Sequence, residues 1–131
     1  MHLHQLPDGT DDLFWRYVQY AFQPDAGPEL EDSDRPNPPH TRYGLYPDES
    51  VTADDEPVTI CSSYDFSLWV RDSLVSAGGL STVATPPEHR RNGYVETMLR
   101  KLCLLYRDDE VSISVLWPFK HAFYAQFGWA T

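Results

Sequence analysis

The clearest periodicity in the chain is a helical one in its C-terminal half. Apolar side chains recur there every three or four residues, at Val95, Met98, Leu99, Leu102, Cys103 and Tyr106. This spacing places them on one face of a helix, so we predict a helix over residues 93–106 that buries this face. A similar pattern over residues 10–22, which follows the candidate N-cap Thr10, predicts a second helix.

Strand-like patterns occupy most of the remaining apolar positions. Val111, Ile113 and Val115 alternate with serines, and the other segments are rich in β-branched and aromatic residues. We predict strands over residues 42–46, 58–70, 80–85 and 111–117, a turn at residues 71–72, and a last helix from Pro118 to Gly128.

The order of these elements predicts one α+β domain with a mixed sheet. The unit that runs from strand 80–85 through helix 93–106 to strand 111–117 has the length of a βαβ crossover. A length of 131 residues is that of a single domain, which we place over residues 1–131. Residues 23–41 are rich in proline and acidic side chains, so we expect a loop there.

The charge balance excludes one class of partner. Twenty Asp and Glu residues oppose ten Lys and Arg residues, which gives a formal net charge of −10. Such a surface repels phosphate backbones, so we expect no nucleic-acid partner. It attracts small cations, and its composition is typical of a protein from a halophile.

Other compositional features point to a cytoplasmic protein without a metal. No stretch approaches the roughly 18 consecutive apolar residues of a membrane helix, and the start lacks the pattern of a signal peptide, so we expect no membrane association. Cys61 and Cys103 lie in predicted elements without metal-ligand spacing, so we expect two buried free thiols. His2 and His4 could bind metal only nonspecifically.

Positive charge gathers in one short stretch, "TPPEHRRNGY", between a predicted strand and a predicted helix. The backbone N–H groups at a helix start carry partial positive charge. Gly93 would let a phosphate approach the backbone, and Arg90 and Arg91 add charge and donors. The stretch therefore predicts an anion site suited to a pyrophosphate. Two surface arginines in front of a helix are the alternative.

Two motifs resemble those of the GNAT acetyltransferase superfamily. Arg90-x-x-Gly93-x-Val95 resembles its pyrophosphate loop, and "AFYAQFGW" resembles its second signature. Over residues 79–131, "GGLSTVATPPEHRRNGY" together with "FYAQFGWAT" is similar to the Eis-like (enhanced intracellular survival) branch. The resemblance implies the GNAT acyl-CoA N-acyltransferase fold, a mixed and mostly antiparallel central sheet flanked by helices.

The resemblance also implies roles for individual residues. The positions implied to bind the cofactor are Val83, Ala84, Thr85, Arg90, Arg91, Asn92, Gly93, Tyr94, Val95, Glu96, Phe119 and Lys120. Val95 departs from the small residue usual in the family. Tyr124 matches the general acid that protonates the departing sulfur, and the alternative is an aromatic residue that only packs. A backbone N–H near Thr82 or Val83 is the candidate for stabilising the oxyanion.

The implied reaction moves acetyl from acetyl-CoA to a primary amine, either a small cationic amine or a protein lysine. In the Eis-like branch the general base is a terminal carboxylate contributed by further domains, and the spacing of Asp65 or Glu88 does not favour either as a substitute. The chain ends at Thr131, so we expect a shortened domain that lacks the last strands, associates with itself and transfers acetyl weakly. An acyl-CoA-binding remnant without catalysis and an interaction subunit are the alternatives.

Overall fold

The computed structural model describes residues 1–22, 40–116 and 124–130. The predicted loop over residues 23–41 therefore lies almost wholly outside the described residues, as do Phe119, Lys120 and the first part of the predicted last helix. Tyr124 and Ala125 are helical and residues 126–128 form a turn, so the described helix ends before Gly128, the predicted end.

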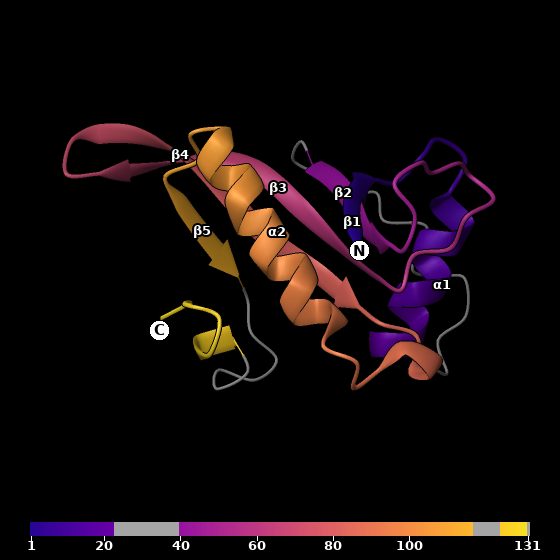
Figure 1. The fold of residues 1–131 in the computed structure, drawn as a ribbon. Helices are drawn as coiled ribbons and strands as arrows, with labels where there is room; N and C mark the ends of the chain where they lie inside the picture. The colour runs from indigo at the N-terminus through magenta and orange to yellow at the C-terminus, as the bar shows by residue number, and fades with distance from the viewer. Residues whose placement is uncertain (23–39, 117–123, 131) are drawn as a thin grey trace.

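A single five-stranded sheet forms the centre of the fold (Figure 1). In spatial order its strands are β1 (His2–Gln5), β2 (His40–Tyr46), β3 (Thr59–Val70), β4 (Ser73–Ala84) and β5 (Ile113–Leu116). The first three pairings are antiparallel, and β4 pairs with β5 in parallel. This arrangement confirms the predicted mixed, mostly antiparallel sheet of an α+β fold.

Helices α1 (Asp11–Phe22) and α2 (Tyr94–Asp108) pack on opposite faces of this sheet. Successive residues of β3 point to opposite faces, so Cys61 joins the core under α2 while Ile60 joins the core under α1. Helix α2 follows β4 and precedes β5 in the chain, as a crossover helix does, and it lies across one face of the sheet (Figure 1). None of the helices in the described ranges is long and apolar enough to cross a membrane.

Strand β1 was not predicted. Its sequence, His-Leu-His-Gln, is short and half polar, so nothing local distinguishes it from an irregular terminus. It is a strand because it pairs with β2, from His2 opposite Tyr46 to Gln5 opposite Tyr43. The neighbouring strand, which is remote in sequence, supplies the hydrogen bonds that define it.

Strand β4 is longer than the predicted strand over residues 80–85, because it begins at Ser73 and continues through two glycines. A Cβ atom on Gly78 would lie 2.6 Å from the ring of Tyr106 in α2. A Cβ atom on Gly79 would lie 2.7 Å from the ring of Phe66 on the opposite face. The glycines therefore let two aromatic rings pack directly against the backbone of the strand.

The expectation that both cysteines are buried is half wrong. Cys61 is fully buried, and burial raises the pKa of its thiol to about 12. Cys103 is exposed. At about 100° per residue, Cys103 lies roughly 80° around the helix from Val95, at the edge of the apolar stripe. The sheet covers only the central positions of α2, which are Met98, Leu99, Leu102 and Tyr106.

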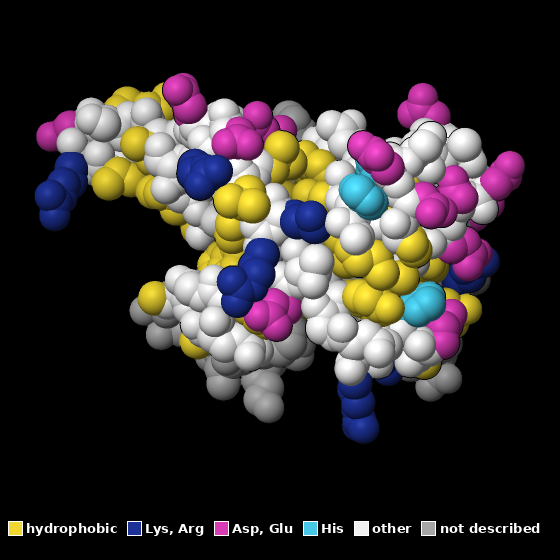
Figure 2. Space-filling model, viewed as in Figure 1, with side chains coloured by type: hydrophobic (Ala, Val, Ile, Leu, Met, Phe, Trp, Pro, Cys, Tyr) yellow, Lys and Arg dark blue, Asp and Glu magenta, His cyan; other side chains and the backbone are white. Residues whose placement is uncertain are grey.

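The β3–β4 hairpin extends beyond the rest of the sheet (Figure 1). Its predicted turn is confirmed, since Arg71 and Asp72 both have positive φ, at 48° and 67°, as a tight hairpin turn needs. Near its tip, Trp69 and Leu74 face each other across the strands with exposed fractions of 74% and 58%. Figure 2 shows hydrophobic side chains along this projecting end.

Candidate functional site

A bulge interrupts β4 two residues before it ends. Ser81 pairs with Ser62 and Ala84 pairs with Ile60, so two residues of β4 lie opposite the single residue Cys61. The extra length is accommodated at Thr82, which has a positive φ of 54°. A non-glycine residue in this region is uncommon and worth a functional explanation.

On its other side, the described pairing of β4 with β5 ends before the bulge. The last residue pair between the described parts of β4 and β5 is Leu80 with Leu116. On the β3 side, the hydroxyl of Thr59 donates a 3.0 Å hydrogen bond to the carbonyl of Ala84. Between these two points, Val83 has no register partner in the described parts of β3 and β5.

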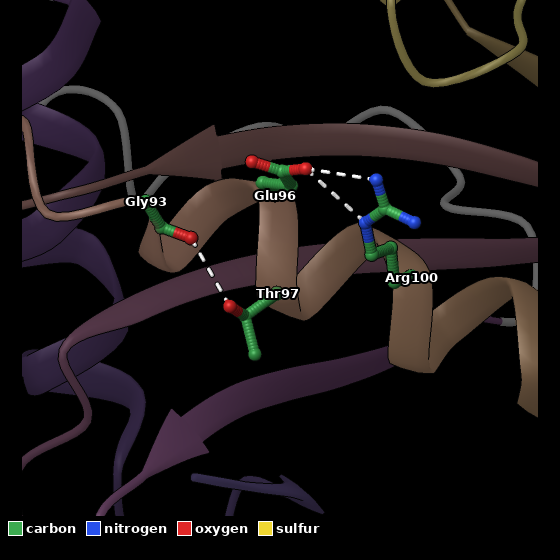
Figure 3. Close-up of polar contacts among 4 residues, drawn as sticks. All are labelled: Gly93, Glu96, Thr97 and Arg100. Atoms are coloured by element: carbon green, nitrogen blue, oxygen red, sulfur yellow. Dashed lines mark hydrogen bonds and ion pairs between the residues drawn. The ribbon is translucent and has the colours of Figure 1, made fainter.

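Helix α2 starts at an uncapped end (Figure 3). Gly93 is its N-cap residue with φ 73°, and no side chain in the described part of the protein caps it. The first helical hydrogen bond runs from the N–H of Thr97 to the carbonyl of Gly93 over 3.1 Å, and the Thr97 hydroxyl donates to the same oxygen. The N–H groups of Tyr94, Val95 and Glu96 precede that bond, so they have no intrahelical acceptor.

These N–H groups border a cavity of about 280 Å³. Its lining consists of Thr85, His89, Arg90, Arg91, Asn92, Gly93, Tyr94, Val95, Glu96, Gln126 and Phe127. The fold thus brings together the whole predicted pyrophosphate loop, the end of β4 and the C-terminal turn. Val83 and Ala84 do not line this cavity. Ala84 is buried with Ile60 in the core under α1, and Val83 packs against the core under α2.

The two loop arginines have different surroundings, which the sequence did not indicate. Arg90 donates from Nε to the carbonyl of Thr85 over 3.2 Å, and from Nη2 to the carbonyl of Tyr20 in α1 over 3.3 Å. Arg91 is exposed and takes part in none of the ion pairs within the described part of the chain. Arg90 therefore ties the loop to α1, and Arg91 is available to an anion.

Glu96 places a negative charge among these donors. Its carboxylate is paired with Arg100 one turn further along α2, at 2.9 Å, so its repulsion of an anion is reduced (Figure 3). The side-chain amide of Asn92 donates to the carbonyls of His89 and Arg90, both at 3.2 Å, and thereby fixes the curvature of the loop. The cavity keeps a net positive environment in an acidic protein.

Tyr124 lies in the core between the sheet and α2. It is 5% exposed and belongs to the same hydrophobic cluster as Leu80, against which Val83 also packs. Its ring meets that of Trp129 edge to face, with centroids 6.4 Å apart. Burial raises the pKa of the Tyr124 hydroxyl, so the group is protonated at neutral pH.

The structure also shows a hollow that sequence reasoning missed. A trough of about 460 Å³ lies over the middle of the sheet, lined by Tyr64, Phe66, Gly79, Leu80, Ser81, Val115 and Leu116. The alternation of aromatic and polar residues in β3 was the only local signal for it. Asp65 and Glu88, the candidate bases, line neither this trough nor the cavity at α2.

No group of three or more His, Cys, Asp or Glu residues suited to a metal is found within the ranges that the structure describes. The expectation that the site holds no metal stays a prediction, because part of the chain lies outside those ranges.

Comparison with solved structures gives the same fold in several acyltransferases. A probable N-acyltransferase of Enterococcus faecalis superposes with a TM-score of 0.74 and 20% identity, over 97% of this chain and 31% of its own. A GCN5-related N-acetyltransferase of Kribbella flavida gives 0.73 and 23%, over 97% of this chain and 32% of its own. This chain thus spans about a third of the length of both proteins.

A protein of similar length shares the fold as well. The ribosomal-protein-alanine N-acetyltransferase of Brucella melitensis gives a TM-score of 0.71 at 17% identity, over 100% of this chain and 94% of its own. Sequence comparison with curated proteins finds no match. The family model of the acetyltransferase (GNAT) domain matches residues 3–131. With almost the whole chain matched, and with this fold and loop, the protein belongs to the GNAT acetyltransferase family.

Proposed function

We propose that this domain transfers an acetyl group from acetyl-CoA to a primary amine. The observation that carries the proposal is the uncapped start of α2 at Gly93, which opens into a cavity that Thr85, the residue after β4, also lines. A helix N-terminus that is preceded by glycine and flanked by a free arginine is a site for a phosphate group.

The described residues fit both the pyrophosphate and the pantetheine arm of acetyl-CoA. The N–H groups of Tyr94, Val95 and Glu96 and the guanidinium of Arg91 would hold the pyrophosphate. The backbone of Val83, at the bulge of β4, would pair with an amide of the pantetheine arm. Arg90 would act mainly by holding the loop in place through its bonds to Thr85 and Tyr20.

The proposed transfer has three steps: attack by the amine, stabilisation of the oxyanion and departure of the thiolate. The neutral amine nitrogen attacks the thioester carbonyl carbon and forms the C–N bond. A backbone N–H at the bulge, from Thr82 or Val83, would stabilise the oxyanion. The C–S bond then breaks and the hydroxyl of Tyr124 protonates the thiolate, while the proton lost by the amine passes through water to the Tyr124 phenolate and restores the hydroxyl.

Narrower assignments are part of the same proposal. The match of residues 79–131 to the Eis-like motifs supports membership of that branch. The net charge of −10 supports an origin in a halophile and a cytoplasmic location at high salt. The acceptor would be a cationic amine in solution, since a net charge of −10 attracts small cations.

A matched pair of glycine variants tests the donor site. Gly93 and Gly9 both have positive φ, at 73° and 82°, and neither has an atom within 4 Å of a built Cβ. Gly93→Leu and Gly9→Leu should therefore strain the backbone alike, but only Gly93→Leu blocks the approach of a phosphate. We expect isothermal titration to show acetyl-CoA binding by the wild type and Gly9→Leu, and little by Gly93→Leu. Equal binding by the two variants would contradict the proposed site.

A further inference from the structure

We infer that the trough over β3, β4 and β5 is the acceptor pocket, and that it takes a primary amine carried on an aromatic group through a short alkyl chain. The inference rests on the proposed function, which it deepens by naming the class of acceptor. Three observations support it: the face of the sheet to which Tyr64 and Phe66 of β3 point, the uncharged lining of the trough, and the position of the trough beside the bulge of β4.

The trough lies on the face of the sheet opposite α2. Ser63 points toward α2, since its hydroxyl is hydrogen-bonded to that of Tyr106. Tyr64 follows Ser63 directly, so its side chain points to the opposite face. Phe66, two residues further along β3, points to the same face as Tyr64. Gly79 is the register partner of Tyr64, and the ring of Phe66 lies against its bare backbone. Two aromatic rings therefore border one strip of sheet.

Strands β3 and β4 form two sides of the trough, and β5 forms the third. Val115 is the register partner of Gly79 in the parallel pair and is 37% exposed. The resulting hollow of about 460 Å³ falls within the range of roughly 300–1,000 Å³ that is typical of small-molecule sites. It is wide enough for one ring and a short chain.

One end of the trough reaches the place where the thioester would lie. Ser81 lines the trough and directly precedes the bulge, and its hydroxyl is 3.1 Å from that of Thr82. Thr82 and Val83 carry the backbone N–H groups assigned to the oxyanion. An amine that enters over Tyr64 and Phe66 would therefore present its nitrogen at the acetyl carbon.

The chemistry of the lining selects the acceptor. All seven residues that border the trough are uncharged. Aromatic faces attract one ammonium group, but every further charge brought into such surroundings lacks a partner and costs free energy. An apolar environment also favours the neutral form of the amine, which is the nucleophile. A monoamine with a flat apolar body fits these conditions better than a polyamine.

The test uses two amines and two variants of the protein saturated with CoA. The probes are 2-phenylethylamine and spermidine. Val115→Glu adds a carboxylate to the trough at a half-exposed position, and Leu74→Glu adds the same charge at an exposed position near the hairpin tip. Isothermal titration should give at least a tenfold lower Kd for 2-phenylethylamine than for spermidine, with the order reversed or equalised in Val115→Glu and unchanged in Leu74→Glu.

Tighter binding of spermidine by the wild type, or the same preference in both variants, would overturn the inference. Acetyl transfer is measured separately, as thiol release from acetyl-CoA with each amine. Binding of 2-phenylethylamine without thiol release would leave the pocket assignment standing and would count against the proposed transferase function. Thiol release with spermidine but not with 2-phenylethylamine would overturn the inference and keep that function.

Discussion

Arg90 and Arg91 are neighbours in sequence, but the structure predicts different consequences for their removal. Arg90 donates hydrogen bonds to the carbonyls of Thr85 and Tyr20. These bonds join the loop to the end of β4 and to α1. Arg91 is exposed, lines the cavity and takes part in none of the ion pairs of the described residues. Replacing Arg90 by alanine should lower the stability of the fold, whereas replacing Arg91 by alanine should weaken the binding of acetyl-CoA.

The expected magnitudes follow from these contacts. Two partly exposed hydrogen bonds at Arg90 are worth about 1 kcal/mol together, which corresponds to a Tm lower by about 4 °C. A charge-assisted contact from Arg91 to a phosphate is worth about 1.5 kcal/mol at the low end, which is about a tenfold increase in the Kd for acetyl-CoA. High salt reduces the second effect, because the charge is exposed to solvent.

Thermal melts and isothermal titration with acetyl-CoA measure the two effects on the same samples. Arg71→Ala, at the hairpin turn, is the control, since it removes the same charge from an exposed position outside the cavity lining. We expect Arg91→Ala to weaken binding with an unchanged Tm, and Arg90→Ala to lower the Tm. The reasoning is refuted if Arg91→Ala melts early and binds normally, or if both variants behave like Arg71→Ala.

Three further outcomes are expected. The unfolding midpoint should rise from low to molar salt, because the screening of a net charge of −10 relieves repulsion; equal midpoints by circular dichroism would count against this. Tyr124→Phe should bind acetyl-CoA normally but release thiol at least about tenfold more slowly, and the wild-type rate should fall only above the usual pKa range of a phenol, since burial raises the pKa of Tyr124. The protein should associate with itself in light scattering, and replacing the exposed pair Trp69 and Leu74 by serine should reduce that association; a monomeric wild type would show that self-association is wrong.

Local patterns predicted the parts of the fold that local forces determine. The apolar stripe of α2 and the dense β-branched run of β3 are visible in any short window of sequence, and both elements formed where they were expected. The place of the loop before α2 was predictable for the same reason, since strand, loop, glycine and helix follow one another, and its binding of an anion stays a prediction. Strand β1 was missed because its only support is pairing with β2, about 40 residues away.

The rest of the site depends on contacts that no window contains. The role of Arg90 is set by the carbonyl of Tyr20, which is 70 residues distant in sequence. The trough combines Tyr64, Gly79 and Val115 from three strands, and only the sheet register brings them together. A one-residue shift of that register would turn Tyr64 and Phe66 toward α2 and close the hollow.

The bulge at Thr82 connects the two halves of the proposed reaction. A regular strand would give each residue of β4 a partner in β3, whereas the bulge leaves two residues opposite Cys61. A positive φ of 54° at a threonine costs of order 1–3 kcal/mol and persists only where the surroundings enforce it. In sequence, Thr82 lies between Ser81, which lines the trough, and Thr85, which lines the cavity at Gly93. The strained residue is therefore explained if the thioester carbonyl binds there, with the donor arriving from the α2 side and the amine from the opposite face.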